Sequence, residues 1–240
     1  MPVLIDADIL AFQVASKAEV ATQFDDDMWV LWADAKQARN EVDDAIEAIK
    51  YTTGRDEVVL CLSGKNNFRY SVCDSYKSNR SGKRRPMILR HLREYMIDMY
   101  DAQVVDGLEG DDLIGILATG EYKDDHLIYS ADKDLKTVPG THWHGMDVDI
   151  EEDEARRYFY RQVLTGDVTD GYKGCPGVGP VKADKLLDAD CSWQTIVAAY
   201  EKAGLAISDA LTQARLAFIL HASHFKNGKP VLWTPPMESA

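Results

Sequence analysis

Three acidic side chains lie close together in VDGLEGDD, residues 105–112, where Glu109, Asp111 and Asp112 precede an apolar stretch that predicts a helix over 112–118. Carboxylates this close repel one another unless a cation lies between them. Oxygen-rich sites suit Mg²⁺ or Mn²⁺, and two such ions can drive in-line cleavage of a phosphodiester. Acidic residues also favour helix N-termini, so EGDD by itself is equally typical of a solvated helix cap.

Other carboxylates follow short apolar segments elsewhere in the chain. Asp6 follows the apolar residues 3–5, and Asp132 and Asp134 follow the apolar segment 126–130. Open α/β sheets bind ligands at the carboxyl ends of their strands, and residues i and i+2 of an extended segment point the same way. We therefore expect these carboxylates to share a site. Asp167 and Asp170, three residues apart, form a further acidic pair.

The elements that must position these residues alternate between strand and helix. We predict strands over 3–5, 57–63, 103–105 and 126–130, and helices over 34–51, from Pro86 to Met99, over 151–164, 192–203 and 207–221. A solvated turn is expected at 25–27, and a hairpin or edge strand over 142–150. This order predicts an α/β fold with a mostly parallel central sheet flanked by helices, residues 1–165, and a helical C-terminal part, residues 166–240, packed on it as one domain.

Charge is distributed unevenly along the chain. The net charge is −13, yet residues 65–93 hold nine Lys or Arg against one acid, and this basic segment also carries Phe68, Tyr70 and Tyr76. Cations interleaved with aromatic rings suit contact with nucleic acid, although a basic run is more often a solvated face. The sequence shows neither a membrane-length apolar run nor a signal peptide, and its four cysteines form no CxxC pair, so we expect a cytoplasmic protein without zinc or disulfides.

A glycine-rich turn precedes the predicted helix near residue 180. GVGP, residues 177–180, leads into an apolar segment that carries Lys182 and Lys185. Glycines at a helix N-terminus let backbone N–H groups approach a phosphate without reading bases, as in a helix-hairpin-helix element. A plain Gly/Pro-rich connector is the alternative explanation.

Five segments in this order resemble the 5′-nuclease (flap endonuclease-like) family, and most of all its branch of 5′→3′ exonucleases from T7-like phages. They are DADIL, FRYSVCDSYKSNR, LEGDD, SADKDLKTVPG and GDVTDGYKGCPGVGPVKADKLL. The resemblance implies a PIN/5′-nuclease-like fold and a metal-dependent 5′→3′ exodeoxyribonuclease that hydrolyses duplex DNA by a two-metal mechanism. Flap endonuclease and RNase H-like primer removal, and hence RNA–DNA hybrid binding, are further implied activities. A monomer is expected.

The resemblance also implies roles for individual residues. Lys77 and Arg80 match basic residues beside the scissile phosphate, and a K⁺ ion is implied near the glycine turn. Two divalent metal ions, Mg²⁺ or Mn²⁺, are implied at Asp6, Glu109, Asp111, Asp112, Asp132, Asp134, Asp167 and Asp170. The implied DNA contacts are Arg69, Tyr76, Lys83, Arg84, Arg85, Gly177, Gly179 and Lys182. Residues 81–93 match the arch that holds the 5′ end, and 174–185 the element that grips the duplex.

One departure from the family bears on the metal site. Where the family has an Asp at the end of the second strand, this chain has Ser63, which puts one metal position in doubt. A non-catalytic DNA-binding module would explain the basic segment and glycine turn, but it would leave the clustered carboxylates as pure repulsion. DADIL also resembles the start of haloacid-dehalogenase-type phosphatases, in which the first Asp is a nucleophile. A phosphatase of this type would leave the basic segment without a function.

Overall fold

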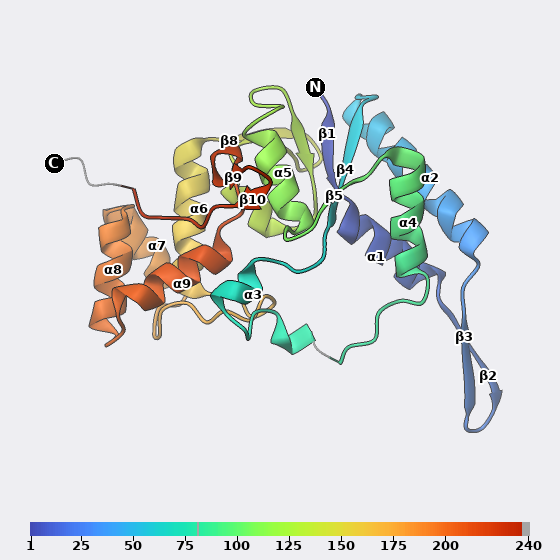
Figure 1. Ribbon diagram of the computed structural model, residues 1–240, viewed down its shortest axis with the longest axis horizontal. Helices are drawn as coiled ribbons and strands as arrows, with labels where there is room; N and C mark the ends of the chain where they lie inside the picture. Colours follow the sequence, from blue (N-terminus) through green and yellow to red (C-terminus); the bar gives the residue numbers. More distant parts are fainter. Residues whose placement is uncertain (81, 237–240) are drawn as a thin grey trace.

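The computed structural model describes residues 1–80 and 82–236; Ser81, within the predicted arch, and residues 237–240 lie outside the described part. Its centre is a six-stranded sheet in the order β5-β4-β1-β6-β7-β8, in which only β8 runs antiparallel to its neighbour (Figure 1). The strands are β1 Val3–Asp6, β4 Val58–Ser63, β5 Gln103–Val105, β6 Leu127–Tyr129, β7 Gly140–Trp143 and β8 Asp147–Ile150. The predicted strands and the edge hairpin are confirmed.

Helices cover both faces of this sheet. One face carries α1 Ala7–Ala18, α2 Ala35–Thr53 and α4 Leu89–Tyr100. The opposite side carries α5 Gly110–Ala118, α6 Glu152–Thr165, α7 Pro180–Ala189, α8 Trp193–Lys202 and α9 Ile207–Ala217 (Figure 1). Shorter elements are α3 Arg69–Val72, the 3₁₀ helices Ser78–Arg80, Lys133–Thr137 and Ala222–His224, and a small hairpin, β9 Phe225–Lys226 with β10 Lys229–Pro230.

The strands read as continuous apolar runs because both of their faces are buried. Val3 and Ile5 of β1 belong to the core under α1 and α2, whereas Leu4 points into the core shared with α5 and the C-terminal helices. Two cores separated by one sheet are what the alternation of strands and helices predicts. The predicted α/β class is therefore confirmed.

Local signals set the ends of α2 correctly but misplaced the start of α4. Asp34 accepts backbone N–H groups of Lys36 and Gln37 as the N-cap of α2, and Gly54 ends that helix with φ 66°. Pro86 was expected to begin a helix, yet its carbonyl only accepts the N–H of Leu89, where α4 starts. Met99, in the last turn of α4, is 63% exposed.

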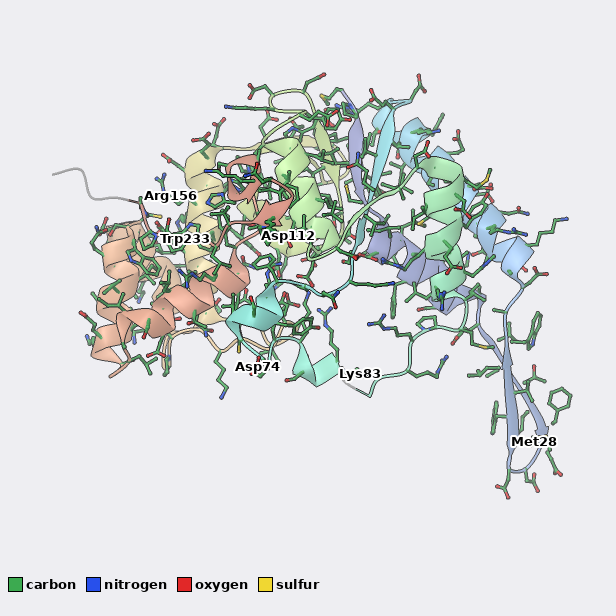
Figure 2. The ribbon with its side chains drawn as sticks, in the orientation of Figure 1. Met28, Asp74, Lys83, Asp112, Arg156 and Trp233 are labelled. Atoms are coloured by element: carbon green, nitrogen blue, oxygen red, sulfur yellow. The ribbon has the colours of Figure 1, made fainter. Side chains whose placement is uncertain are left out.

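One hairpin departs from the compact body. The strands β2 Val20–Asp25 and β3 Met28–Trp32 pair only with each other and project away from the sheet, with Met28 at the far end (Figures 1 and 2). Phe24, Trp29 and Trp32 are all exposed on it. The sequence predicted only the turn at its tip, because β3 is apolar at every position and β2 mixes apolar and polar residues without alternation.

No helix in the described ranges is long and apolar enough to cross a membrane.

Candidate active site

The carboxyl edge of the sheet brings together acidic residues from distant parts of the chain. Asp6 ends β1, and Asp132 follows the neighbouring strand β6. Glu109 caps the N-terminus of α5, and Asp111 lies in its first turn. Strand ends and a helix start converge here because the three elements are adjacent in the fold, although over 120 residues separate Asp6 from Asp132.

The first group of carboxylates is Asp6, Glu109, Asp111 and Asp132. Burial raises the pKa of Asp111 well above its usual value, and the charges of Asp6 and Asp132 raise it further. Burial likewise raises the pKa of Asp6 to about 6, although its oxygens accept the N–H of Ile9 and the hydroxyl of Ser130, at 3.2 and 3.0 Å. Clustered carboxylates with perturbed pKa values of this kind are typical of sites that bind a cation.

The second group is Asp134, Asp167 and Asp170. Burial and the charge of Asp132 raise the pKa of Asp134 to about 7. Burial would also raise the pKa of Asp167, but its hydrogen bond with Lys133, at 2.8 Å, holds that pKa below the usual value. Asp132 therefore acts electrostatically on both groups, which are neighbours along the same edge.

Lys77 bridges the two groups. Its Nζ lies 2.5 Å from Glu109 Oε1 and 3.4 Å from Asp170 Oδ2, and its backbone has φ 53°. Burial would lower the pKa of Lys77, but the Glu109 and Asp170 charges raise it instead, so the ammonium stays protonated. Arg80 adds a contact to Asp170 Oδ1 at 2.7 Å. The basic segment thus inserts its cations between the carboxylates.

The described residues contain no three His, Cys, Asp or Glu side chains that converge closely enough to enclose an ion by themselves. The donor set nevertheless fits hard divalent cations, because both groups offer carboxylate oxygens and neither offers sulfur or imidazole. Lys77 and Lys133 at present satisfy Glu109 and Asp167. A divalent ion would take over part of these contacts.

Comparison with known proteins also supports a nuclease. No protein-family model matches the chain. The exodeoxyribonuclease of Enterobacteria phage T3 is 26% identical over 97% of this chain and 92% of its own length, and the exonuclease of Escherichia phage T7 is 26% identical over 97% and 93%. The chain is similar to these phage exonucleases over nearly its whole length, and this similarity supports a 5′-nuclease close to those of T7-like phages.

Solved structures agree on the fold of the chain. A phage T5 flap endonuclease in a pseudo-enzyme-product complex with DNA and metal ions superimposes with a TM-score of 0.66 at 14% identity, covering 90% of this chain and 88% of the other. The T5 5′-exonuclease with bound zinc gives 0.62 at 14% identity, covering 90% and 93%.

Asp112 does not fit the metal contact expected from the sequence. Its side chain is fully buried, and its oxygens accept two hydrogen bonds from Arg69, at 2.7 and 2.9 Å, as well as the N–H groups of Glu109 and Leu220. Four donors occupy the carboxylate, so no site for an ion remains. Asp112 instead connects α5 with the segment after α9.

Arg69 and Tyr76 are likewise too buried for the DNA contacts expected of them. Both are 2% exposed. Arg69 also donates to the carbonyl groups of Leu216 and Phe218, and the Tyr76 hydroxyl donates to Glu109 and Asp170, both at 3.0 Å. The alternation of aromatic and basic residues suggested a nucleic-acid surface. These two side chains instead contact Glu109, Asp112 and Asp170 from the buried side of the site.

The exposed part of the basic segment is smaller than its charge suggested. Lys83, Arg84 and Arg85 are exposed on the loop before α4, which spans the open side between the two halves (Figures 1 and 2). Arg84 is held to Glu19, at the base of the β2–β3 hairpin, by two hydrogen bonds of 2.7 and 2.6 Å. This pair anchors the loop before α4 to the hairpin.

Several side chains beside the carboxylates make supporting contacts that the sequence motifs did not indicate. Asp8 accepts the N–H of Ser63 at 2.6 Å and forms an ion pair with Arg93 of α4. Ser63, where the family has an Asp, accepts the N–H of Gly110 at 3.0 Å and so supports the start of α5. A second Asp two residues after Asp6 was the available signal, since DADIL contains it. Lys133 carried no comparable signal.

The glycine turn has only part of the predicted form. Gly179 is the N-cap of α7, with Pro180 at its first position, and Gly177 has φ 72°. Gly177, Gly179 and Lys182 are exposed, as a phosphate-binding turn requires. The preceding helix α6 ends at Thr165, however, so residues 166–179 form a long connection rather than a short hairpin between two helices.

Proposed function

We propose that this chain is a metal-dependent 5′→3′ exonuclease that hydrolyses phosphodiester bonds of duplex DNA from the 5′ end. The observation that carries the proposal is the pair of carboxylate groups at one sheet edge with Lys77 inserted between them. A purely structural cluster would place its repelling carboxylates apart or in solvent. The exonuclease relatives and the metal-containing structure of the same fold support this activity.

The proposed metal ligands are the two carboxylate groups without Asp112. Asp6, Glu109, Asp111 and Asp132 would hold one divalent ion, and Asp134, Asp167 and Asp170 the other, directly or through water. Mg²⁺ or Mn²⁺ suits all-oxygen ligands. When bound, these ions would supply Lewis-acid stabilisation of the phosphate and lower the pKa of the attacking water.

The chain's own cations would orient the phosphodiester. Lys77 and Arg80 both reach Asp170, so they lie at the edge of the second group. Once ions neutralise the carboxylates, these side chains can turn their N–H donors to phosphate oxygens and stabilise the charge that develops there. Tyr76 and Arg69 keep Glu109 in position from the buried side.

The proposed substrate contacts use exposed groups only. Lys83, Arg84 and Arg85 would hold the 5′-terminal strand, and Gly177, Gly179 and Lys182 the duplex backbone, with K⁺ as the ion beside that turn. Flaps and RNA–DNA hybrids are further proposed substrates of a monomeric enzyme. Such substrates would be met in the cytoplasm of an infected host.

Neither alternative explains the geometry as well. A phosphatase that uses Asp6 as a nucleophile needs a free carboxylate, whereas this side chain is 6% exposed and accepts two hydrogen bonds. A non-catalytic DNA-binding module would have no use for Asp111, whose pKa is raised by burial and by neighbouring carboxylates. The second alternative remains an outcome of the experiment below.

The test uses linear duplex DNA labelled separately at its 5′ and 3′ ends. We expect early release of the 5′ label as short products, only with Mg²⁺ or Mn²⁺. Asp132→Asn should abolish release while DNA binding remains measurable, because the carboxylate charge is lost and the shape is kept. Asp153→Asn, an exposed acid distant in the fold, is the matched control and should cleave normally. Binding without release by the unaltered protein would select the non-catalytic module, and early 3′ loss would contradict the polarity.

A further inference from the structure

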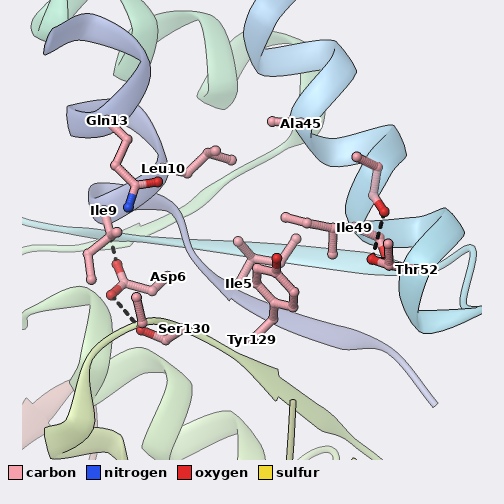
Figure 3. A pocket seen from close by; sticks show the side chains of 12 residues that line it. Ile5, Asp6, Ile9, Leu10, Gln13, Ala45, Ile49, Thr52, Tyr129 and Ser130 are labelled. Atoms are coloured by element: carbon pink, nitrogen blue, oxygen red, sulfur yellow. Dashed lines mark hydrogen bonds between the residues drawn. The ribbon is translucent and has the colours of Figure 1, made fainter. Parts of the chain in front are cut away.

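A hollow of about 400 Å³ opens beside Asp6, between helices α1 and α2 (Figure 3). Asp6 and Ser130 lie at one end, and the ring of Tyr129 lies beside Ile5 and Ile49 (Figure 3). The walls are completed by Ile9, Leu10, Gln13, Ala45 and Ala48. The hollow is thus continuous with the first carboxylate group.

Its position follows from the strand order. From β1 the chain proceeds to β4 and β5 on one side, and then returns to β6 and β7 on the other side of β1. The carboxyl ends of β1 and β6 therefore form a topological switch point, where open α/β sheets leave a crevice for ligands. Asp6 belongs to both the crevice and the proposed metal site.

We propose that this hollow, which we call the base pocket, binds the base of the 5′-terminal nucleotide and retains it in the released deoxynucleoside 5′-monophosphate. The proposal rests on the proposed function, because the phosphodiester on the 3′ side of that nucleotide, the bond that is hydrolysed, must lie at the carboxylate end. The volume falls within the roughly 300–1,000 Å³ of small-ligand pockets. One aromatic ring, aliphatic walls and a few polar groups are the lining that a planar base requires.

The lining predicts that the base pocket accepts every base. The Thr52 hydroxyl, which also lines it, already donates to the carbonyl of Ala48 at 2.7 Å. Gln13 is exposed, and its amide can both donate and accept hydrogen bonds, so it can adapt to different base edges. Stacking and apolar contact would dominate, and these tolerate any sequence. Tolerance of this kind suits an enzyme that degrades a strand step by step.

Direct binding provides the measurement. Titration of the full chain in Mg²⁺ with 2-aminopurine deoxynucleoside 5′-monophosphate, a fluorescent purine nucleotide, should give saturable quenching as the base contacts Tyr129. The four natural deoxynucleoside monophosphates should displace it with dissociation constants within about fivefold of one another. Deoxyribose 5-phosphate, which lacks a base, should compete at least about tenfold more weakly, since base stacking supplies the lost contact.

A substitution that fills the base pocket, compared with a matched control elsewhere, tests the proposal. Ala48→Phe adds a ring to the exposed side of α2 without removing a buried group, and should raise the dissociation constant at least about tenfold. Ala203→Phe, an exposed alanine at the end of α8, should leave it unchanged. Tyr129→Leu should weaken both binding and quenching.

Equal affinity of Ala48→Phe and the unaltered protein, or equal competition by deoxyribose 5-phosphate, would overturn the base pocket. Cleavage of end-labelled duplex is measured on the same preparations. Duplex cleavage with unaltered nucleotide affinity in Ala48→Phe removes the pocket and keeps the nuclease. Specific nucleotide binding without cleavage keeps the pocket and removes the proposed function.

Discussion

Lys77 stands between two sets of carboxylates that would repel one another without it. Its contacts with Glu109 and Asp170 make it an internal counter-ion of both carboxylate groups. The same ammonium would be a phosphate ligand if divalent ions were bound by the carboxylates. One residue would then neutralise the carboxylates and assist the reaction.

We expect Lys77→Met to lower kcat about 10²–10³-fold, the usual effect of removing one donor from a charge-stabilising site. Mg²⁺ affinity, measured by calorimetry, should rise because no internal cation competes for Glu109. The thermal midpoint of the metal-free protein should fall. Lys65→Met, which changes an exposed lysine of the same segment, is the control. Unchanged kcat and Mg²⁺ affinity would contradict this role.

Asp134 predicts a pH dependence. Its folded-state pKa is raised from 3.8 to about 7 by burial and by Asp132, so the folded protein binds this proton more tightly than the unfolded chain does. Charging Asp134 therefore costs stability progressively as pH rises from about 4 to about 7. Asp134→Asn avoids that cost and can still accept the hydrogen bond of Gln162.

We accordingly expect the metal-free Asp134→Asn variant to have a higher thermal midpoint than the unaltered protein at pH 8. The difference should shrink toward pH 4, and excess Mg²⁺ should reverse it at pH 8. Comparing variant with parent cancels the histidines, among them His142 and His221, whose lowered pKa values give an opposite slope. A difference independent of pH would refute the assignment.

At the scale of elements, the buried pair of Arg69 and Asp112 joins three parts of the chain. Arg69 begins α3, Asp112 lies in the first turn of α5, and both bond to the backbone that follows or ends α9. The pair therefore docks the start of the basic segment onto the C-terminal helices. It also holds Glu109, which Arg69 contacts at 3.3 Å.

Breaking this pair should destabilise the fold. Arg69→Met leaves a buried carboxylate without its partner, and about 3–5 kcal/mol of unfolding free energy should be lost in denaturant titration. The double variant Arg69→Met/Asp112→Leu should recover part of that loss because no unpaired charge remains. Arg90→Met, an exposed arginine of α4, should change stability by less than about 1 kcal/mol. A loss for Arg69→Met no larger than this control would remove the docking role.

At the scale of the whole molecule, a net charge of −13 coexists with an exposed basic loop. The 18 basic and 39 acidic residues outside 65–93 give −21, so a polyanion is repelled everywhere except near that segment. Divalent ions at the carboxylates would reduce the repulsion locally. The charge pattern thus directs DNA to one side of the molecule.

Salt dependence measures these contacts. DNA affinity should fall linearly on a log–log plot against salt concentration, and Lys83→Met and Arg85→Met should each reduce the slope by about 1. Lys202→Met, on α8, should leave the slope unchanged. The assay is fluorescence anisotropy with a 5′-labelled duplex in Ca²⁺. Identical slopes for all three variants would mean that the loop does not contact phosphate.

The sequence by itself determined the sheet, most helix limits and the strand-end position of Asp6 and Asp132, because these depend on local hydrophobic periodicity and capping. The order of motifs, set by the chain alone, also sufficed for the family. Even for the exposed hairpin, the sequence predicted the turn at 25–27. Its two strands were not predicted, because their residues do not follow a pattern of burial.

Only the tertiary structure decided which charged side chains are exposed and can bind a ligand, and which form buried ion pairs. Arg69 and Asp112 are 43 residues apart, and their pairing depends on the docking of α3, α5 and the end of α9. Residue type gives the charge of a side chain. Whether that charge binds a ligand or stabilises the fold depends on its burial and its partners. Contacts between distant segments set both. For the same reason Asp8 and Lys133 became visible at the site only in the folded chain, and only the fold showed that Ser63 supports the start of α5.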